Sequence, residues 1–238
     1  MATAELAVDV VAVAAEAGEF AGLRRRAGNV TALAGWWTRQ AWLAEVGGAR
    51  WLLAAHGPGR LAGKAAAEAL EKTGARRVVS VGLCGALDPG LAPGMVVQAH
   101  EVIGGPGGPW ECGAVQGALP AVRVLSIDRV AVGAAEKRRL GAESGAGIVE
   151  MEAAAVAQRA AEAGARFYCV KAVGDGADEE LPMDFNRYRD DEGRFSRGRI
   201  ALACALRPWL APGLLRFDRQ CRQAIERLGE CLAEARFE

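Results

Sequence analysis

The chain has 238 residues, and its 29 basic and 29 acidic side chains give a formal net charge of zero. This length can bury a sizeable core as one large α/β domain, and the charge balance argues against a nucleic-acid partner held by a basic field. Half of the residues are hydrophobic, mostly Ala, Val and Leu, and 31 are glycine. This composition favours helices packed closely on a sheet.

Six cysteines and two histidines are scattered along the chain, with no CxxC pair and no histidine near a cysteine at ligand spacing. We therefore expect no metal site and no disulfide framework, but reduced cysteines as in the cytosol. Glu5 and Asp9 interrupt the first apolar run, which argues against a signal peptide, and no apolar stretch is long enough to span a bilayer. The sequence thus predicts a cytoplasmic protein.

The first half of the chain predicts strands separated by one helix. Valine-rich residues 6–16 predict a buried strand, and residues 49–59 a second strand that runs into a Gly-Pro-Gly turn. Residues 60–73 predict a helix closed by Gly74, because glycine readily adopts the left-handed conformation at a helix end. Residues 75–103 then predict a strand, a glycine-rich loop and another strand.

The second half continues the alternation of strands and helices. After a loop over residues 104–120 we expect, in order, a strand near 121–126, a helix near 134–142, a short strand over 147–149, a helix that ends at Gly164 and a strand that stops at Gly174 and Asp175. This order predicts a three-layer α/β/α sandwich around a twisted, mixed and mostly parallel sheet. With no repeat or linker to divide it, the chain is expected to form one domain over residues 1–238, with 207–238 as a C-terminal helical extension.

Acidic side chains follow three of the predicted strands. Glu16 and Glu19 follow the first strand, Glu152 follows the short strand 147–149, and Asp175 ends the last strand. In open α/β sheets, ligands bind beyond the carboxyl ends of the strands, so we expect these carboxylates to converge. Converging carboxylates suit chemistry at a sugar, where one holds a diol, one donates a proton and one activates water.

Each of these residues also has a simpler interpretation. Glu152, in the first turn of a helix, can serve only to match the helix dipole. Asp175 in "GDGAD" can be a turn residue, and Glu16 and Glu19 can be solvated residues at a helix start. Spacing alone leaves these alternatives open.

Several motifs resemble one known family. "VEMEAAAVA" (149–157) followed by "VKAVGDGADE" (170–179) is similar to the paired signature of the purine nucleoside phosphorylase and nucleosidase superfamily, closest to the branch with methylthioadenosine/S-adenosylhomocysteine nucleosidase. "VVSVGLCGALDPGLAPGMVV" (78–97) resembles its glycine-rich loop, and "HGPGRLAGKAAAEALE" (56–71) its preceding turn and helix. The resemblance runs in order over residues 7–185.

Two further segments resemble a narrower branch. "SIDRVAVGAAEKRRL" (126–140) and "RPWLAPGLLRFDRQCRQAIERL" (207–228) are similar to nucleoside phosphorylase-like proteins of hopanoid biosynthesis, which release adenine from adenosylhopane. The resemblance implies cleavage of the N-glycosidic bond of an adenine nucleoside, with the nucleoside as the small-molecule partner. It also implies a homodimer and no metal or organic cofactor.

The resemblance assigns roles to individual residues. Glu152 would accept hydrogen bonds from the ribose 2′ and 3′ hydroxyls, and Met151 would pack against the ribose. Asp175 would protonate the purine at N7, which requires a pKa raised by burial or by neighbouring carboxylates. Phe185 would cover the 5′ substituent, and Val130 and its backbone would hold the base.

Other residues near these motifs receive lesser roles. Leu83 and Gly85, in the glycine-rich loop, are expected beside the substrate. Glu150, two positions before Glu152, is expected to point to another face of the helix start and to be structural.

The nucleophile is water or phosphate. In the phosphorylases an Arg and a Ser around the glycine loop bind phosphate; here Ser80 stands in place of the Arg and Leu83 in place of the Ser, which removes strong donors. Glu19, or Glu16 one turn earlier, stands where nucleosidases keep a glutamate that activates water, so hydrolysis is favoured. Against this, Arg24–Arg26 remain candidates to approach a phosphate, and the nucleosidases also keep a Ser at the position of Leu83.

Three alternatives compete with this interpretation. "GPGRLAG" (57–63) matches the glycine pattern of a dinucleotide-binding site, but Arg76 and Arg77 stand where such a site has an acidic residue. A nucleoside sensor that has kept the pocket but lost turnover is a second alternative. In the C-terminal segment, apolar residues alternate with arginines; a helix packed on the domain or on a dimer partner is favoured there over a membrane-surface helix.

Overall fold

The computed structural model describes residues 6–35, 38, 40–105 and 107–238; Glu5 of the signal-peptide argument and Pro106 of the predicted loop lie outside this part. The strands are β1 Val10–Ala14, β2 Gly28–Ala32, β3 Gln40–Val46, β4 Ala49–Ala55, β5 Arg77–Ala86, β6 Val96–Ile103, β7 Trp110–Glu111, β8 Val115–Gln116, β9 Ala121–Ser126, β10 Ile148–Glu150, β11 Arg166–Asp175 and β12 Arg236–Phe237. The helices are α1 Ala21–Arg26, α2 Arg60–Thr73, α3 Ala134–Ser144, α4 Ala153–Glu162, α5 Arg197–Leu206 and α6 Ala211–Glu234, with 3₁₀ turns η1 Ala17–Phe20, η2 Phe185–Tyr188 and η3 Pro208–Leu210.

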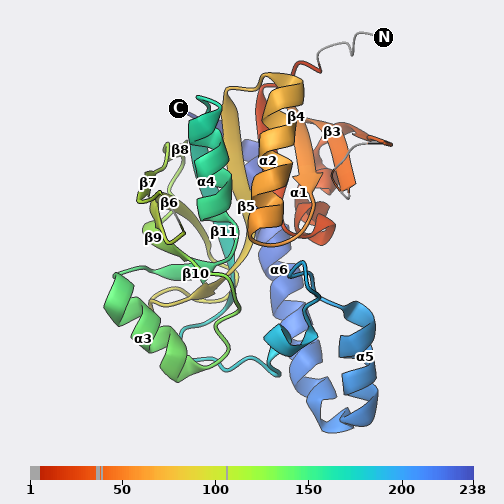
Figure 1. The fold of residues 1–238 in the computed structure, drawn as a ribbon, viewed down its shortest axis with the longest axis vertical. Helices are drawn as coiled ribbons and strands as arrows, with labels where there is room; N and C mark the ends of the chain where they lie inside the picture. Colours follow the sequence, from red (N-terminus) through yellow and green to blue (C-terminus); the bar gives the residue numbers. More distant parts are fainter. Residues whose placement is uncertain (1–5, 36–37, 39, 106) are drawn as a thin grey trace.

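One large mixed sheet forms the centre of the molecule (Figure 1). Its strands run in the order β10-β9-β6-β11-β5-β1-β4-β3-β2, with β7 paired to β6. The central strands β4, β1, β5 and β11 are parallel neighbours, whereas β2, β3 and β4 pair antiparallel, as do β11 and β6. β6, β9 and β10 are also parallel neighbours, at one end of the strand order. The prediction of a mixed α/β sheet is therefore confirmed.

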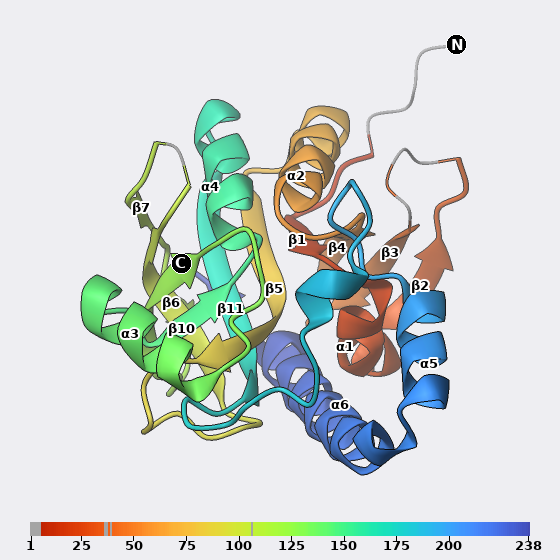
Figure 2. The ribbon, with the colours of Figure 1, turned by 60° about the horizontal axis from the view of Figure 1, so that its bottom comes forward.

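Helices cover both faces of this sheet, α2 and α4 on one face and α1 and α6 on the other (Figures 1 and 2). The two faces follow the alternation of side chains along β1. Val11 and Val13 pack with Ala66 of α2 in one core cluster, while Ala12 packs with Leu228 of α6 in another. This arrangement confirms the predicted three-layer sandwich.

The small residues of α2 and α4 let these two helices approach each other closely. A Cβ atom added to Gly63 of α2 would lie 3.0 Å from the Ala155 side chain of α4. Gly74 ends α2 in the left-handed conformation, as predicted. The predicted strands near 121–126 and up to Asp175 also agree with β9 and β11.

Some elements were not predicted from the sequence. The unpredicted β3 forms a hairpin with β4, which agrees with the predicted strand at 49–59, and the turn between them is Gly47-Gly48, both with positive φ, a common pairing in two-residue hairpins. The predicted loop 104–120 contains the short strands β7 and β8, and β8 pairs with β12 near the C-terminus.

The C-terminal region has two structurally different parts. The second half of α6 packs on the sheet, with Ala224, Leu228 and Leu232 buried in the core. In contrast, α5, η3 and the start of α6 project away from the sheet (Figure 1). Among the described residues no single helix is long and apolar enough to cross a membrane; residues 197–206 and 208–234 pass that test only as a pair, which is bent by 109°.

Candidate active site

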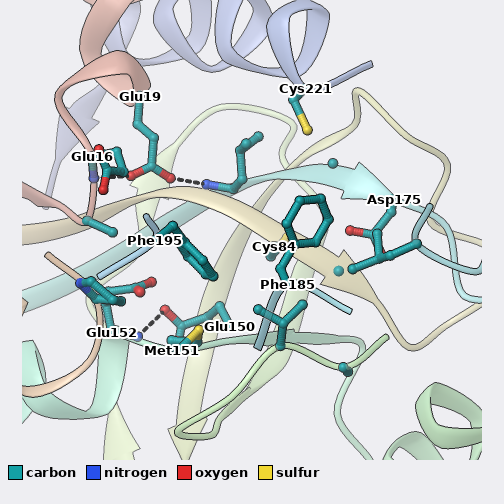
Figure 3. Close-up of a pocket in the computed structure, with 18 of the residues that line it drawn as sticks. Glu16, Glu19, Cys84, Glu150, Met151, Glu152, Asp175, Phe185, Phe195 and Cys221 are labelled. Carbon is teal, nitrogen blue, oxygen red and sulfur yellow. Dashed lines mark hydrogen bonds between the residues drawn. The ribbon is translucent and has the colours of Figure 1, made fainter. Parts of the chain in front are cut away.

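A cavity of about 450 Å³ opens beyond the carboxyl ends of β1, β5, β10 and β11, a size usual for small-molecule sites. All of the residues predicted for the site line this one cavity: Glu16, Glu19, Leu83, Gly85, Val130, Met151, Glu152, Asp175 and Phe185. Glu16, Glu19, Glu150 and Glu152 lie on one side of it, and Asp175 lies across from them (Figure 3). The expected convergence of carboxylates at the strand ends is thus observed.

The strand register explains why the two signature motifs meet. Gly85 of β5 is paired on one side with Val149 of β10 and on the other with Asp175 of β11. A Cβ atom at position 85 would lie 3.2 Å from Asp175 Oδ2. A glycine here therefore lets the Glu-Met-Glu segment and Asp175 flank the same strand end without crowding the carboxylate.

Asp175 is buried and paired with a lysine that sequence reasoning did not identify. The fully buried Lys137 of α3 donates through Nζ to the Asp175 carboxylate. The same Nζ also donates to the carbonyl oxygens of Gly176, at 2.8 Å, and Glu179, at 2.9 Å. Burial raises the pKa of Asp175 above its ordinary value, against the opposing charge of Lys137.

A second buried lysine, Lys171 of β11, lies between two glutamates. Its Nζ is 2.8 Å from Glu150 Oε2 and 3.5 Å from Glu152 Oε2. Burial, together with the charges of Glu150 and Glu19, raises the pKa of Glu152 to about 8, against the attraction of Lys171. Although burial opposes it, Lys171 holds the pKa of Glu150 below its ordinary value.

Glu150 corrects one prediction. Its carboxylate and that of Glu152 both reach Lys171, so the two side chains do not point to separate faces. The physical reason is that neither lies inside the helix: Glu150 ends β10, and α4 begins at Ala153 with Glu152 as its N-cap. The Glu150 carboxylate accepts hydrogen bonds from the Glu152 and Ala153 N–H groups and from Ser126, which gives it the structural role that was expected.

Glu19 is fixed inside the pocket by two backbone donors. The Leu83 N–H donates to Oε1 at 2.8 Å and the Glu16 N–H to Oε2 at 2.9 Å. Burial raises the pKa of Glu19. A Cβ atom on Gly82, whose φ is 135°, would come within 2.4 Å of Glu19 Oε1, so this contact requires glycine.

Glu16 is placed differently from Glu19. Both residues are half-buried, but the Glu16 carboxylate lies 3.4 Å from the guanidinium of the exposed Arg197. Of the two glutamates considered for activating water, Glu19 is therefore the one whose carboxylate is held by backbone N–H donors.

The cavity also has an apolar wall. Phe185 packs against Phe195, at 6.5 Å between ring centroids, and against Phe217, at 5.7 Å. Ile200 of α5 and Ile225 of α6 complete this wall. The sequence predicts a site role for Phe185 alone: Phe195 and Ile200 lie outside the motifs, and the motif of residues 207–228, which contains Phe217 and Ile225, assigns no role to either.

Val130 lines the cavity, but its backbone is already paired. Its N–H donates to Asn186 Oδ1 and its carbonyl oxygen accepts from Asn186 Nδ2, both at 2.9 Å. A base held by this backbone would have to displace the Asn186 amide. The neighbouring Arg129 and Ala131 also line the cavity here.

The arginines proposed as alternative phosphate ligands lie elsewhere. Arg24 stacks on Trp42, at 4.3 Å from the ring centroid, and Arg25 and Arg26 pair with Glu226 of α6. Their guanidinium groups are thus engaged by α6 and Trp42, and none of them lines the pocket.

The dinucleotide-binding alternative is also not supported. Arg76 and Arg77 are exposed at the start of β5, whereas the Gly-Pro-Gly turn lies at the other end of α2. Arg76 and Arg77 therefore cannot reach a phosphate bound at that turn. Among the described residues, no group of three or more His, Cys, Asp and Glu side chains is placed to hold a metal ion.

The fold and the pocket together define an α/β protein that gathers carboxylates and an apolar wall in one cavity at the strand ends of a mixed sheet. The sequence model of the Phosphorylase superfamily matches residues 10–118 and 112–205, and the chain belongs to this superfamily. This match confirms the predicted membership in the superfamily of nucleoside phosphorylases and nucleosidases and, with it, that the protein is an enzyme of this kind. No curated protein sequence matches the chain.

Solved structures share the fold over nearly the whole chain. The 5′-methylthioadenosine/S-adenosylhomocysteine nucleosidase of Neisseria meningitidis, in complex with methylthio-immucillin-A, is 23% identical with a TM-score of 0.69, covering 94% of this chain and 96% of that one. The S-adenosylhomocysteine nucleosidase of Streptococcus pyogenes is 18% identical with a TM-score of 0.71, covering 98% and 97%. The futalosine hydrolase of Helicobacter pylori is 14% identical with a TM-score of 0.66, covering 93% and 94%.

Proposed function

We propose that the protein hydrolyses the N-glycosidic bond of an adenine nucleoside and releases the free base. One observation carries this proposal: Asp175, Glu152 and Glu19 line one pocket, with Asp175 across from the two glutamates (Figure 3). A nucleoside placed between them would present its base to Asp175 and its ribose to the glutamates. The solved structures of similar fold include nucleosidases bound to nucleoside analogues.

Asp175 would act as the general acid. The C1′–N9 bond electrons move to the base as it leaves, and the Asp175 proton passes to N7, so the base departs neutral. The raised pKa of Asp175 keeps this proton available. After the transfer, the carboxylate is left beside the Lys137 ammonium, which stabilises the charge that has formed.

The glutamates around Lys171 would stabilise the sugar. Glu152 would accept hydrogen bonds from the 2′ and 3′ hydroxyls, and Met151 would pack against the ribose. Glu19, Glu150 and Glu152 lie around the Lys171 ammonium. Burial raises the pKa of both Glu19 and Glu152, and a developing oxocarbenium ion would favour their ionised forms, so that negative charge already in position lowers the barrier.

Glu19 would activate the water. Water oxygen attacks C1′ while one of its protons passes to Glu19, whose raised pKa makes it a better base once it is ionised. The Leu83 and Glu16 N–H groups fix the direction of this carboxylate. Glu19 is therefore proposed in this role in preference to Glu16.

Phosphorolysis is the second candidate, and Arg197 is the observation in its favour. Arg197 and Arg129 are the arginines among the residues described as lining the pocket. Arg129 is paired with Glu136 and Arg197 with Glu16, so a phosphate would have to compete with these carboxylates.

The apolar wall of Phe185, Phe195 and Phe217 supports a large apolar 5′ substituent on the nucleoside, as in adenosylhopane.

A product assay tests the proposal. The protein is incubated with adenosine or methylthioadenosine, with and without phosphate, and base and sugar products are separated. We expect adenine and the free sugar at a rate indifferent to phosphate, and this activity to be lost in Glu19→Gln. Sugar 1-phosphate formed only in the presence of phosphate would make the protein a phosphorylase and move attention to Arg197.

The buried Lys137 gives a prediction about pH dependence. The general acid is active while it is protonated, so kcat/KM falls as pH rises through the pKa of Asp175. Lys137 opposes the elevation of this pKa, so Lys137→Met should move the alkaline limb of the profile to higher pH. The measurement is kcat/KM for adenosine from pH 5 to 10, with the exposed Lys64 changed to Met as the matched control.

Melting temperatures show whether Lys137→Met remains folded at each pH. Loss of the bonds to Gly176 and Glu179 leaves one buried and one half-buried carbonyl group without the Lys137 donor, and should cost about 1–3 kcal/mol each at most. An alkaline limb that stays in place in a folded variant would mean that Lys137 only supports the loop.

A further inference from the structure

Large exposed apolar side chains concentrate in one part of the molecule, residues 197–219, which we call the C-terminal tip. Leu202, Leu206, Trp209 and Leu215 are 61%, 71%, 71% and 66% exposed. Outside the tip, Val30 at 36% is the remaining large hydrophobic of this kind among the described residues. Isolated exposed hydrophobics are ordinary, but a group on one projecting element marks an interaction surface.

The tip also concentrates positive charge. It contains five arginines, namely Arg197, Arg199, Arg207, Arg216 and Arg219, and one acidic residue, Asp218. The whole chain has equal numbers of basic and acidic residues, so this excess is local. Leucine and tryptophan interleaved with arginine is the composition of helices that lie in the interface of a membrane.

Helical geometry separates the exposed side chains from those of the pocket. Leu202 and Leu206 are four positions apart and share one face of α5. Ile200, which lines the pocket, is two positions from Leu202, about 200° around the helix axis. The same separation holds in α6 between the exposed Leu215 and Phe217 of the pocket wall. The tip therefore presents one side to the cavity and another to its surroundings.

We propose that the C-terminal tip binds the surface of a bilayer containing anionic lipids, with Leu202, Leu206, Trp209 and Leu215 inserted among the headgroups. Arginines beside the inserted side chains would contact the lipid phosphates. The 109° bend between the two helical segments suits an element that lies on a surface.

A second copy of the chain is the competing occupant, and charge disfavours it. In a twofold dimer the same patch faces itself, so the arginines of one tip would lie against those of the other. Like charges brought together in an interface oppose association. An anionic surface satisfies both the apolar and the charged side chains of the tip.

This inference goes beyond the proposed reaction and is tested without it. Membrane binding by the tip would also fix where the cavity lies relative to the bilayer, because Phe195, Ile200 and Phe217 of the pocket wall come from or adjoin the tip. Docking of the tip would bring the apolar wall of the cavity next to the bilayer. A nucleoside with an apolar 5′ group would then enter from the lipid side.

The experiment is co-sedimentation of the full chain with phosphatidylcholine vesicles that contain or lack phosphatidylglycerol. We expect binding to the anionic vesicles, weakened by salt, and a decrease of about tenfold or more in the partition coefficient for Leu206→Glu/Trp209→Glu. Arg207→Gln and Arg216→Gln should each weaken binding by about fivefold. Val30→Glu is the matched control and should bind as the unchanged chain does.

Unaltered melting temperatures and unaltered turnover of a water-soluble nucleoside would show that the variants are folded, because none of these residues lines the cavity. Absence of binding by the unchanged chain would overturn the proposal, as would binding that survives Leu206→Glu/Trp209→Glu. Light scattering gives the oligomeric state in parallel. A dimer that these substitutions convert to a monomer, without any vesicle binding, would assign the tip to a second copy instead.

Discussion

Asp175→Asn is expected to lower kcat for adenine release by about 10²–10⁴-fold, the usual contribution of a general acid. The amide preserves the shape of the side chain but has no acidic proton to give to the leaving base. The Michaelis constant should change little, because the loss arises in the transition state. Single-turnover release of adenine from adenosine measures the effect on the chemical step.

A substrate with an intrinsically good leaving group supplies the control. In 4-nitrophenyl β-D-ribofuranoside the leaving group is 4-nitrophenolate, a stabilised anion that needs little protonation. Asp175→Asn should therefore reduce hydrolysis of this substrate far less than it reduces adenine release. An equal loss on both substrates would show that the substitution damages the pocket generally, for instance by leaving Lys137 without its anionic partner. If the unchanged protein has no turnover, and Asp175→Asn changes only its affinity for the nucleoside, the protein is a nucleoside sensor.

The carboxylates of the site were predictable because one topological rule places them. Glu19, Glu152 and Asp175 each follow a strand, and the carboxyl ends of these strands meet at one edge of the sheet. The rule does not distinguish Glu16 from Glu19. That distinction depends on which carboxylate the Leu83 N–H reaches, 64 positions along the chain.

The two buried lysines illustrate what sequence patterns miss. Lys137 lies in "AAEKRRL", where four charged residues in a row resemble a solvated helix face. Its burial depends on acceptors about 40 positions away, at Asp175, Gly176 and Glu179. Lys171 carried a usable signal, because it lies within the otherwise apolar "FYCVKAV", a strand covered on both faces. A lysine there requires buried carboxylates nearby.

The C-terminal segment combined two roles in one stretch of sequence. The apolar residues between Trp209 and Phe217, interleaved with arginines, predict a helix packed on the domain or on a dimer partner, yet Trp209 and Leu215 are exposed. The residues of this segment that pack in the core come later, at Ala224, Leu228 and Leu232. The beginning of the same helix projects with α5 instead. The spacing of apolar residues is similar in the first and second halves of α6, so the sequence does not indicate which half packs on the sheet. That depends on where the sheet ends. Removal of residues from Arg207 onward would take core side chains with it, which is why point substitutions test the tip.

Lys171→Met is expected to lower the free energy of unfolding by about 3–5 kcal/mol, the cost of leaving a buried charge without its partner. Methionine approximates the volume of the lysine stem, so the loss arises from charge and not from a cavity. The variant leaves the carboxylates of Glu150 and Glu152, both buried, without the ammonium that lies 2.8 Å and 3.5 Å from them. Urea denaturation at pH 7 measures the difference.

The pH dependence of this deficit tests its electrostatic origin. In the unchanged protein Glu150 has a folded-state pKa below its ordinary 4.5, so its contribution is present above that pH and is lost as pH falls. Without Lys171 the folded-state pKa values of Glu150 and Glu152 both rise, so the folded variant binds more protons than the unfolded chain and gains stability as pH falls from 7 to 5. The deficit should therefore shrink with falling pH.

Replacing one of the two glutamates by glutamine should restore part of the stability of Lys171→Met, as protonation at low pH does. Glu150→Gln keeps an oxygen that accepts the Ala153 N–H bond that begins α4 but removes one uncompensated charge. Lys171→Met/Glu150→Gln should be more stable than Lys171→Met at pH 7, and its stability should depend less on pH. A double variant no more stable than the single one would mean that Lys171 stabilises the fold through packing, and the charge cluster proposed to stabilise the sugar would lose its structural support.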